Sequence, residues 1–65
     1  MNIYMNAQPF EVKKGDSVEQ AVSAFGAIPP YAILLNENFL PKSEHENTLL
    51  AEDDKVEVIS AIQGG

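Results

Sequence analysis

The sequence predicts an α+β fold in which one mixed sheet of four to five strands packs on a single helix. Two runs at the start of the chain and one near its end alternate between apolar and polar residues, as half-buried strands do. Between them lies one segment in which apolar residues recur with the period of a helix. Because strands come before and after one helix in the sequence, a single sheet packed on that helix is favoured.

The first part of the chain has the pattern of a β-hairpin. Residues 1–6 alternate, with Ile3 and Met5 on one face, and residues 10–13 alternate again. The connection between the two runs is short, and Pro9 is tolerated where a strand begins because no ladder N–H is needed there. We therefore expect two antiparallel strands.

The next segment, residues 18–25, is the single predicted helix. Ser17 precedes it as a good N-cap, Gln20 completes a Ser-x-x-Gln capping box, and Gly26 suits the left-handed position after its end. Its apolar stripe has the i, i+3, i+4, i+7 spacing and consists of Val18, Ala21, Val22 and Phe25.

The second half of the chain continues in extended segments. Residues 31–35 form an apolar run after two prolines, which is typical of a strand buried on both faces or of one that shows an apolar face to a partner. After a turn at 36–38, residues 39–40 form a short strand that Pro41 stops. Residues 42–50 are predicted to be irregular or a single helical turn.

The last strand is predicted in residues 55–63, after a turn at 51–54. The order of elements fits the β-grasp, or ubiquitin-like, architecture, with the N- and C-terminal strands parallel at the sheet centre and residues 1–65 as one domain. The predicted core contains the residues on the apolar side of each period: Ile3, Met5, Val12, Val18, Val22, Phe25, Val56 and Val58.

Composition and charge exclude several classes of function. The 65 residues are 45% apolar, which suits a small globular domain, and without cysteine there is neither a disulfide nor a thiolate. Ten acidic residues against four lysines give a net charge of −6, so nucleic-acid and membrane roles are disfavoured and a partner with a basic docking face is favoured. With no signal-peptide pattern and only short apolar runs, we expect a cytoplasmic protein.

The chain ends in Gly64 and Gly65, directly after the last strand-like run. Glycine adds nothing to a core and weakens a strand end, but it makes a thin tail with an unhindered carboxylate that a narrow enzyme channel can admit. A frayed terminus of small residues is the alternative interpretation. We expect residues 63–65 to be a flexible tail.

These features together resemble the sulfur carrier proteins of thiamine biosynthesis, the ThiS family. The resemblance covers essentially the whole chain and depends on the order and spacing of the motifs. Glu37 departs from it, since the family often has an Asn-Gly turn there, and we expect Asn36 or Asn38 to take the left-handed conformation instead. The matching motifs are the helix entry at 15–18, the segments 35–36 and 39–43, the strand 54–58 and the Gly-Gly end.

The resemblance implies a protein co-substrate that is not itself an enzyme, with no catalytic residue and no bound cofactor. A ThiF-like adenylyltransferase would use ATP to adenylate Gly65, and a persulfide derived from a cysteine desulfurase would convert it to a thiocarboxylate. Thiazole synthase would then receive the sulfur. The preceding residues, Gly64, Gln63 and Ile62, would be recognised by these enzymes.

The last strand also predicts a docking face. If Val56 and Val58 face the helix, then Glu57, Ile59 and Ala61 face away from it. Ile59 would lie close to Leu34 or Ile33 of the neighbouring strand. A single exposed apolar residue without a role is the alternative. We favour a docking patch that contains Ile59, Ala61 and Leu34.

Other candidate sites are weak. His45 lies between two glutamates, but one histidine without a second ligand at a defined spacing predicts a solvated loop residue and no metal site. Asp53 and Asp54 are expected to form a turn beside Lys55 instead of acting as an acid-base pair.

Two alternatives to the thiamine carrier stay open. One is a relative of the molybdopterin-synthase small subunit, and the other is a non-covalent ubiquitin-like interaction module.

Overall fold

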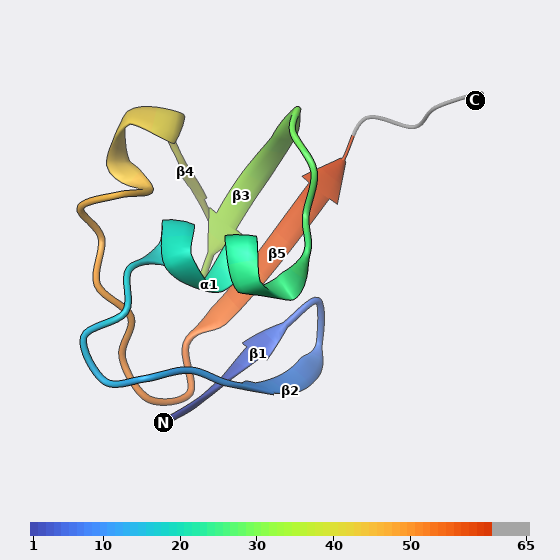
Figure 1. Ribbon diagram of the computed structural model, residues 1–65. Helices are drawn as coiled ribbons and strands as arrows, with labels where there is room; N and C mark the ends of the chain where they lie inside the picture. The colour runs from blue at the N-terminus through green and yellow to red at the C-terminus, as the bar shows by residue number, and fades with distance from the viewer. Residues whose placement is uncertain (61–65) are drawn as a thin grey trace.

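The computed structural model describes residues 1–60 and confirms the predicted fold: one helix packed on a five-stranded mixed sheet (Figure 1). The sheet has the order β2-β1-β5-β3-β4. Its elements within the described residues are β1 (Asn2–Met5), β2 (Gln8–Glu11), α1 (Val18–Phe25), β3 (Tyr31–Leu35), β4 (Asn38–Leu40), the 3-10 turn η1 (Lys42–Glu44) and β5 (Lys55–Ser60).

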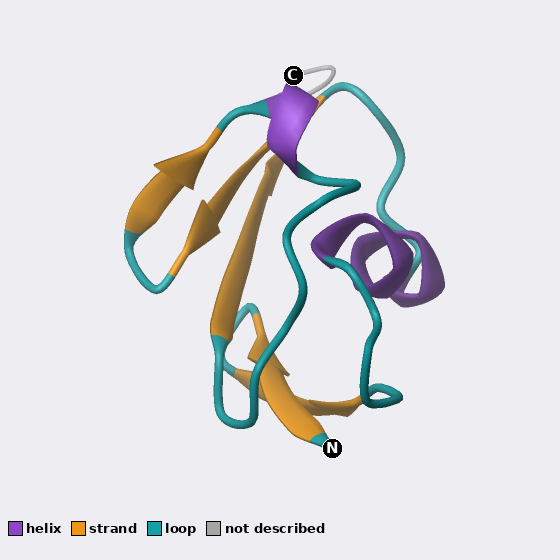
Figure 2. Cartoon of the chain, turned by 90° about the vertical axis from the view of Figure 1, so that its left-hand side faces the viewer, coloured by secondary structure: helices purple, strands orange, loops and turns teal. Residues whose placement is uncertain are grey.

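The two terminal strands meet at the middle of the sheet. β5 pairs in parallel with β1 and antiparallel with β3, so the last strand is the central one, as predicted. Helix α1 lies across one face, and the opposite face carries no helix of the described chain (Figure 2). The predicted final strand extended to residue 63; its last three residues lie outside the described part of the chain.

Helix α1 has the predicted ends. The N–H of Gln20 donates to the Ser17 hydroxyl at 3.2 Å, and Gln20 Oε1 accepts from the Ser17 N–H at 2.7 Å, which completes the capping box. Gly26 has φ 97° and its N–H donates to the Val22 and Ser23 carbonyls. Both ends of the helix are thus determined by local hydrogen bonds that the sequence encodes.

The core lies between α1 and the sheet. Phe25 and Val58, which were predicted to be core residues, are only half-buried and pack against its edge. Phe25 lies in the last turn of the short helix and meets Phe10 edge-on, with ring centroids 5.7 Å apart. The buried apolar residues are Ile3, Met5, Val12, Val18, Ala21, Val22, Ile33, Leu50 and Val56.

The two hairpin turns are tighter than the sequence suggested. Asn6 and Ala7 have φ of 51° and 70° and form a two-residue turn, so Pro9 lies inside the edge strand β2, paired with Tyr4. In the second hairpin Asn36 and Glu37 have φ of 51° and 72°. Glu37 itself therefore takes the left-handed conformation expected only of a neighbouring asparagine, because a two-residue turn of this type needs positive φ at both positions.

Candidate functional site

The candidate site begins at the end of the central strand. β5 runs through the middle of the sheet, and the described chain ends at Ser60 (Figure 1). The predicted tail residues Ile62, Gln63, Gly64 and Gly65 all lie outside the described residues, and so does Ala61 of the predicted docking patch. The structure therefore describes the strand that leads to the tail.

The sheet face opposite α1 carries Ile59 and Leu34, and we call it the open face. Ile59 is 52% exposed and lies directly across from Ala32, whereas Leu34 is half-buried and lies across from Glu57. Ile33, the alternative neighbour of Ile59, is fully buried on the other face. Strand alternation explains this division, since successive side chains point to opposite sides of a sheet.

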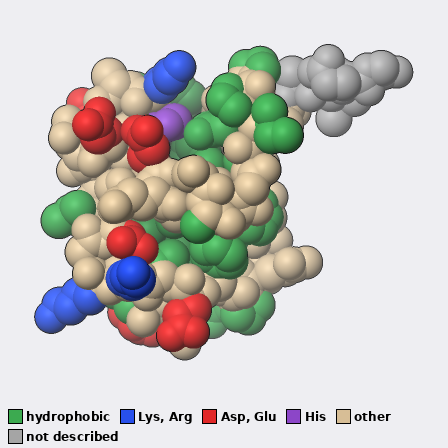
Figure 3. All heavy atoms as spheres, in the orientation of Figure 1, with side chains coloured by type: hydrophobic (Ala, Val, Ile, Leu, Met, Phe, Trp, Pro, Cys, Tyr) green, Lys and Arg blue, Asp and Glu red, His purple; other side chains and the backbone are tan. Residues whose placement is uncertain are grey.

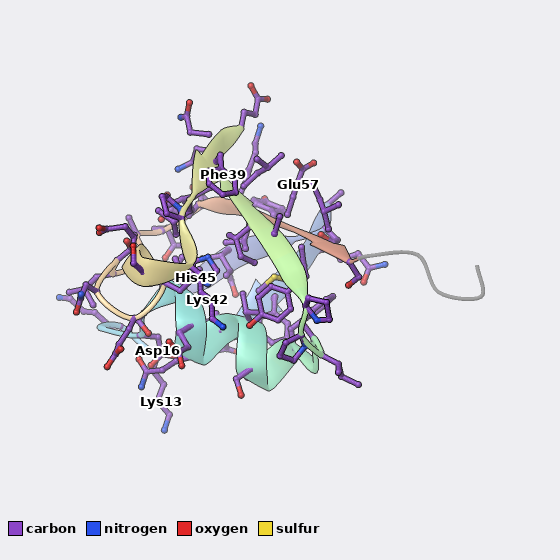
Figure 4. The ribbon with its side chains drawn as sticks, turned by 90° about the horizontal axis from the view of Figure 1, so that it is seen from above. Lys13, Asp16, Phe39, Lys42, His45 and Glu57 are labelled. Carbon is purple, nitrogen blue, oxygen red and sulfur yellow. The ribbon has the colours of Figure 1, made fainter. Side chains whose placement is uncertain are left out.

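Two further apolar side chains belong to the open face, and neither was part of the predicted docking patch. Phe39 on β4 is 64% exposed and lies across from Leu34, while Tyr4 on β1 is 39% exposed. Phe39 and Glu57 both point away from the helix when the molecule is seen from above (Figure 4). The period-two pattern of β1 already places Tyr4 opposite Ile3 and Met5, so this signal could have found it.

Among the described residues, two hollows adjoin the open face. One of about 370 Å³ lies beside the pairing of β1 with β5 and is lined by Tyr4, Ala7, Glu37, Lys55, Val56 and Glu57. The other, of about 310 Å³, lies at the end of β5 and is lined by Pro30, Tyr31, Ala32, Ile59 and Ser60. The open face therefore combines exposed apolar side chains with charged ones, and its hollows can receive a partner's side chains.

Hydrogen bonds from the first hairpin turn hold the central strand in place. The Val58 N–H donates to Asn6 Oδ1 at 2.8 Å, and the Asn6 N–H donates to the Val56 carbonyl at 2.9 Å. Asn6 thus ties the turn between β1 and β2 to β5 close to the last described residue, Ser60. A strand held on both sides gives the open face a fixed shape.

His45 is not the solvated loop residue that the sequence predicted. It is 5% exposed, its Nε2 lies 3.0 Å from the Leu40 carbonyl oxygen, and its ring stacks on Tyr31 at 6.3 Å between centroids. Its own carbonyl accepts the Glu19 N–H at 3.0 Å, so the loop closes over the start of α1. The exposed glutamates beside it concealed this packing, which depends on contacts far apart in the sequence.

The surroundings of His45 and of the paired aspartates indicate structural roles for these residues. Within residues 1–60, no group of three or more histidine and acidic residues could hold a metal ion. Asp54 accepts the Ala51 N–H at 2.7 Å, and Asp53 has φ 70°, so both belong to the turn before β5. On the face seen in Figure 3, two acidic side chains lie side by side next to the histidine, and lysines project from the surface at the top and at the lower left.

Comparison with known proteins identifies the family. The profile of the ThiS family matches residues 3–65. The chain belongs to the ThiS family. ThiS proteins are small sulfur carriers and not enzymes, so the membership supports a sulfur-carrier role. No helix among the described residues is long and apolar enough to cross a membrane.

A solved structure extends the comparison. The thiamine biosynthesis protein ThiS from Geobacter metallireducens is 25% identical, and the alignment covers 100% of both chains with a TM-score of 0.82. A comparison with curated proteins gives no match. The likeness agrees with the ThiS family and with the β-grasp topology of this chain.

Proposed function

We propose that this ThiS-family protein carries sulfur as a thiocarboxylate on Gly65 and delivers it for thiazole formation in thiamine biosynthesis. The observation that carries the proposal is the family match, which runs from residue 3 to the terminal glycine. The structural likeness to a thiamine biosynthesis protein supports the pathway. The molybdopterin alternative has no comparable support.

The proposed chemistry explains a glycine terminus. A carboxylate is a poor electrophile, but its attack on the α-phosphate of ATP releases pyrophosphate and leaves a mixed anhydride with AMP. A persulfide then attacks the carbonyl carbon and AMP leaves, and a thiol cleaves the resulting acyl disulfide to free the thiocarboxylate. A side chain on Gly65 would crowd the attacked carbon, and one on Gly64 would hinder the approach of the enzyme.

The proposed partners would bind the protein through its open face and its tail. A ThiF-like adenylyltransferase would bind the open face through Ile59, Ala61 and Leu34, and Ile62, Gln63 and Gly64 would enter its channel. Ile59 supports this assignment because a large apolar side chain that is 52% exposed is available for burial. Thiazole synthase and the persulfide donor would use the same tail in turn.

The tail is tested by deleting Gly65 or replacing it with valine. Each protein is incubated with ATP and the adenylyltransferase of the same organism, and pyrophosphate exchange is followed. We expect wild type to react and both variants to fail, because the carbon is either moved back by one residue or shielded by two branches at Cβ. Circular dichroism should show the same fold in all three.

The opposite result would favour another function. If the shortened protein reacts as fast as wild type, the carrier assignment fails and the non-covalent interaction module takes its place. Mass spectrometry of protein from the native host gives an independent check, because a thiocarboxylate replaces one oxygen by sulfur.

A further inference from the structure

The hollow beside the pairing of β1 with β5 combines charge with apolar walls. It has a volume of about 370 Å³ and is lined by Tyr4, Ala7, Glu37, Lys55, Val56 and Glu57. Tyr4 and Lys55 are direct partners across the parallel strands, and Glu57 follows Lys55 on the same face. Two glutamates and one lysine therefore contribute to the lining of the hollow.

Glu57 is the unusual member of this set. It lies on the central strand, directly across from Leu34, and its neighbour on the same face of β5 is Ile59. In the free protein the carboxylate is exposed to water. Covering the open face would remove that water, and burying an ionised carboxylate without a partner is unfavourable. A partner that docks here is therefore favoured if it supplies a cation in addition to Lys55.

The surroundings of Glu57 indicate which cation. Glu37 lies in the turn between β3 and β4 and adds a second carboxylate, so the one ammonium of Lys55 does not balance the hollow. Tyr4, which is 39% exposed, supplies an aromatic side chain. A guanidinium is planar, stacks on an aromatic ring and can bond a carboxylate through two N–H groups, whereas an ammonium acts as a point charge.

We propose that this hollow receives an arginine side chain from the enzyme that docks on the open face, with Glu57 as its carboxylate partner and Tyr4 as its stacking surface. The inference rests on the proposed function, because it takes the adenylyltransferase as the docking protein. Glu37 strengthens the negative potential at the entrance. The overall charge of −6 acts in the same direction and speeds the encounter with a basic surface.

The first experiment measures binding to the adenylyltransferase. Glu57→Gln keeps the size of the side chain and removes its charge, and we expect the dissociation constant to rise roughly tenfold and its dependence on salt to become weaker. Tyr4→Leu keeps an apolar side chain and should weaken binding severalfold. Glu44→Gln, which removes an equal charge from the exposed turn η1, is the matched control and should bind as wild type does.

A second experiment does not need the enzyme. The 15N-labelled protein is titrated with N-acetyl-arginine amide, with N-acetyl-lysine amide and with uncharged N-acetyl-norleucine amide. We expect the arginine compound to shift the amide signals of Tyr4, Lys55 and Glu57 more than the other two, and Glu57→Gln to abolish the difference. Equal shifts from the arginine and lysine compounds would overturn the choice of a guanidinium.

The two experiments separate the inference from the function. Equal affinity of wild type and Glu57→Gln for an enzyme that adenylates both would overturn the inference and leave the carrier function intact. If wild type is not adenylated at all, the proposed function fails, and the arginine titration alone decides whether the hollow binds a guanidinium. If the arginine compound shifts amide signals over the whole protein, without a maximum at Glu57, the titration rejects guanidinium binding in the hollow.

Discussion

The side chain of Asn36 joins the turn between β3 and β4 to Asp54, at the entrance of the central strand. Asn36 Nδ2 donates to Asp54 Oδ1 at 3.0 Å, and Asn36 Oδ1 accepts the Lys55 N–H at 2.9 Å. The Asn36 N–H also donates to the Lys55 carbonyl at 2.7 Å. One residue with φ 51° thus fixes both a hairpin turn and the start of the strand that leads to the tail.

We expect Asn36→Ala to lower the free energy of unfolding by about 1 to 3 kcal/mol, because two side-chain hydrogen bonds are lost and alanine is disfavoured at positive φ. Asn36→Gly removes the same hydrogen bonds without the backbone penalty and should cost less. Urea unfolding of both variants measures the two contributions, and equal losses would show that the backbone conformation of Asn36 is unstrained.

Glu37→Gly should raise the stability of the protein by up to about 1 kcal/mol. Glu37 has φ 72°, which costs an ordinary residue about 1 to 2 kcal/mol, and the greater chain entropy of glycine offsets part of the gain. Asn38→Gly, in the neighbouring strand β4, should lower stability and serves as the control. A stability loss in Glu37→Gly would contradict the left-handed turn.

His45→Phe should destabilise the protein by about 1 to 3 kcal/mol. Phenylalanine can keep the stacking on Tyr31, but it removes the hydrogen bond from the ring to the Leu40 carbonyl in a partly buried place. His45→Gln keeps a donor and loses the ring, so the pair of variants separates the hydrogen bond from the stacking in thermal unfolding. If the phenylalanine variant is as stable as wild type, the Leu40 contact contributes little.

Ile59→Asp should leave the free energy of unfolding within about 1 kcal/mol of wild type, because Ile59 is 52% exposed on the open face. It should nevertheless weaken binding to the adenylyltransferase, since docking would bury the new charge. Ser43→Asp adds the same charge to the turn η1 and controls for net charge. Unchanged affinity of Ile59→Asp would remove Ile59 from the docking face.

The sequence by itself determined the elements and their order. The stripe of α1, its capping box with Ser17 and Gln20, and the alternation in β1 depend on residues within one or two turns of each other, so local periodicity and hydrogen bonding predict them. The family resemblance, which the comparison confirmed, likewise uses motifs in linear order. For the open face, the alternation of side chains along the last strand is enough to place Ile59 on the side away from the helix.

Only the tertiary structure decided what depends on contacts between distant segments. Tyr4 meets Lys55 across parallel strands, Leu34 meets both Glu57 and Phe39, and the hollow exists only because these strands lie side by side. His45 is buried because its loop folds back over α1, although its neighbours in sequence are exposed and charged. Local patterns predict on which face of the sheet a side chain lies. Which residues meet across the sheet depends on strand order and register, because strand pairing aligns residues that no short-range pattern connects.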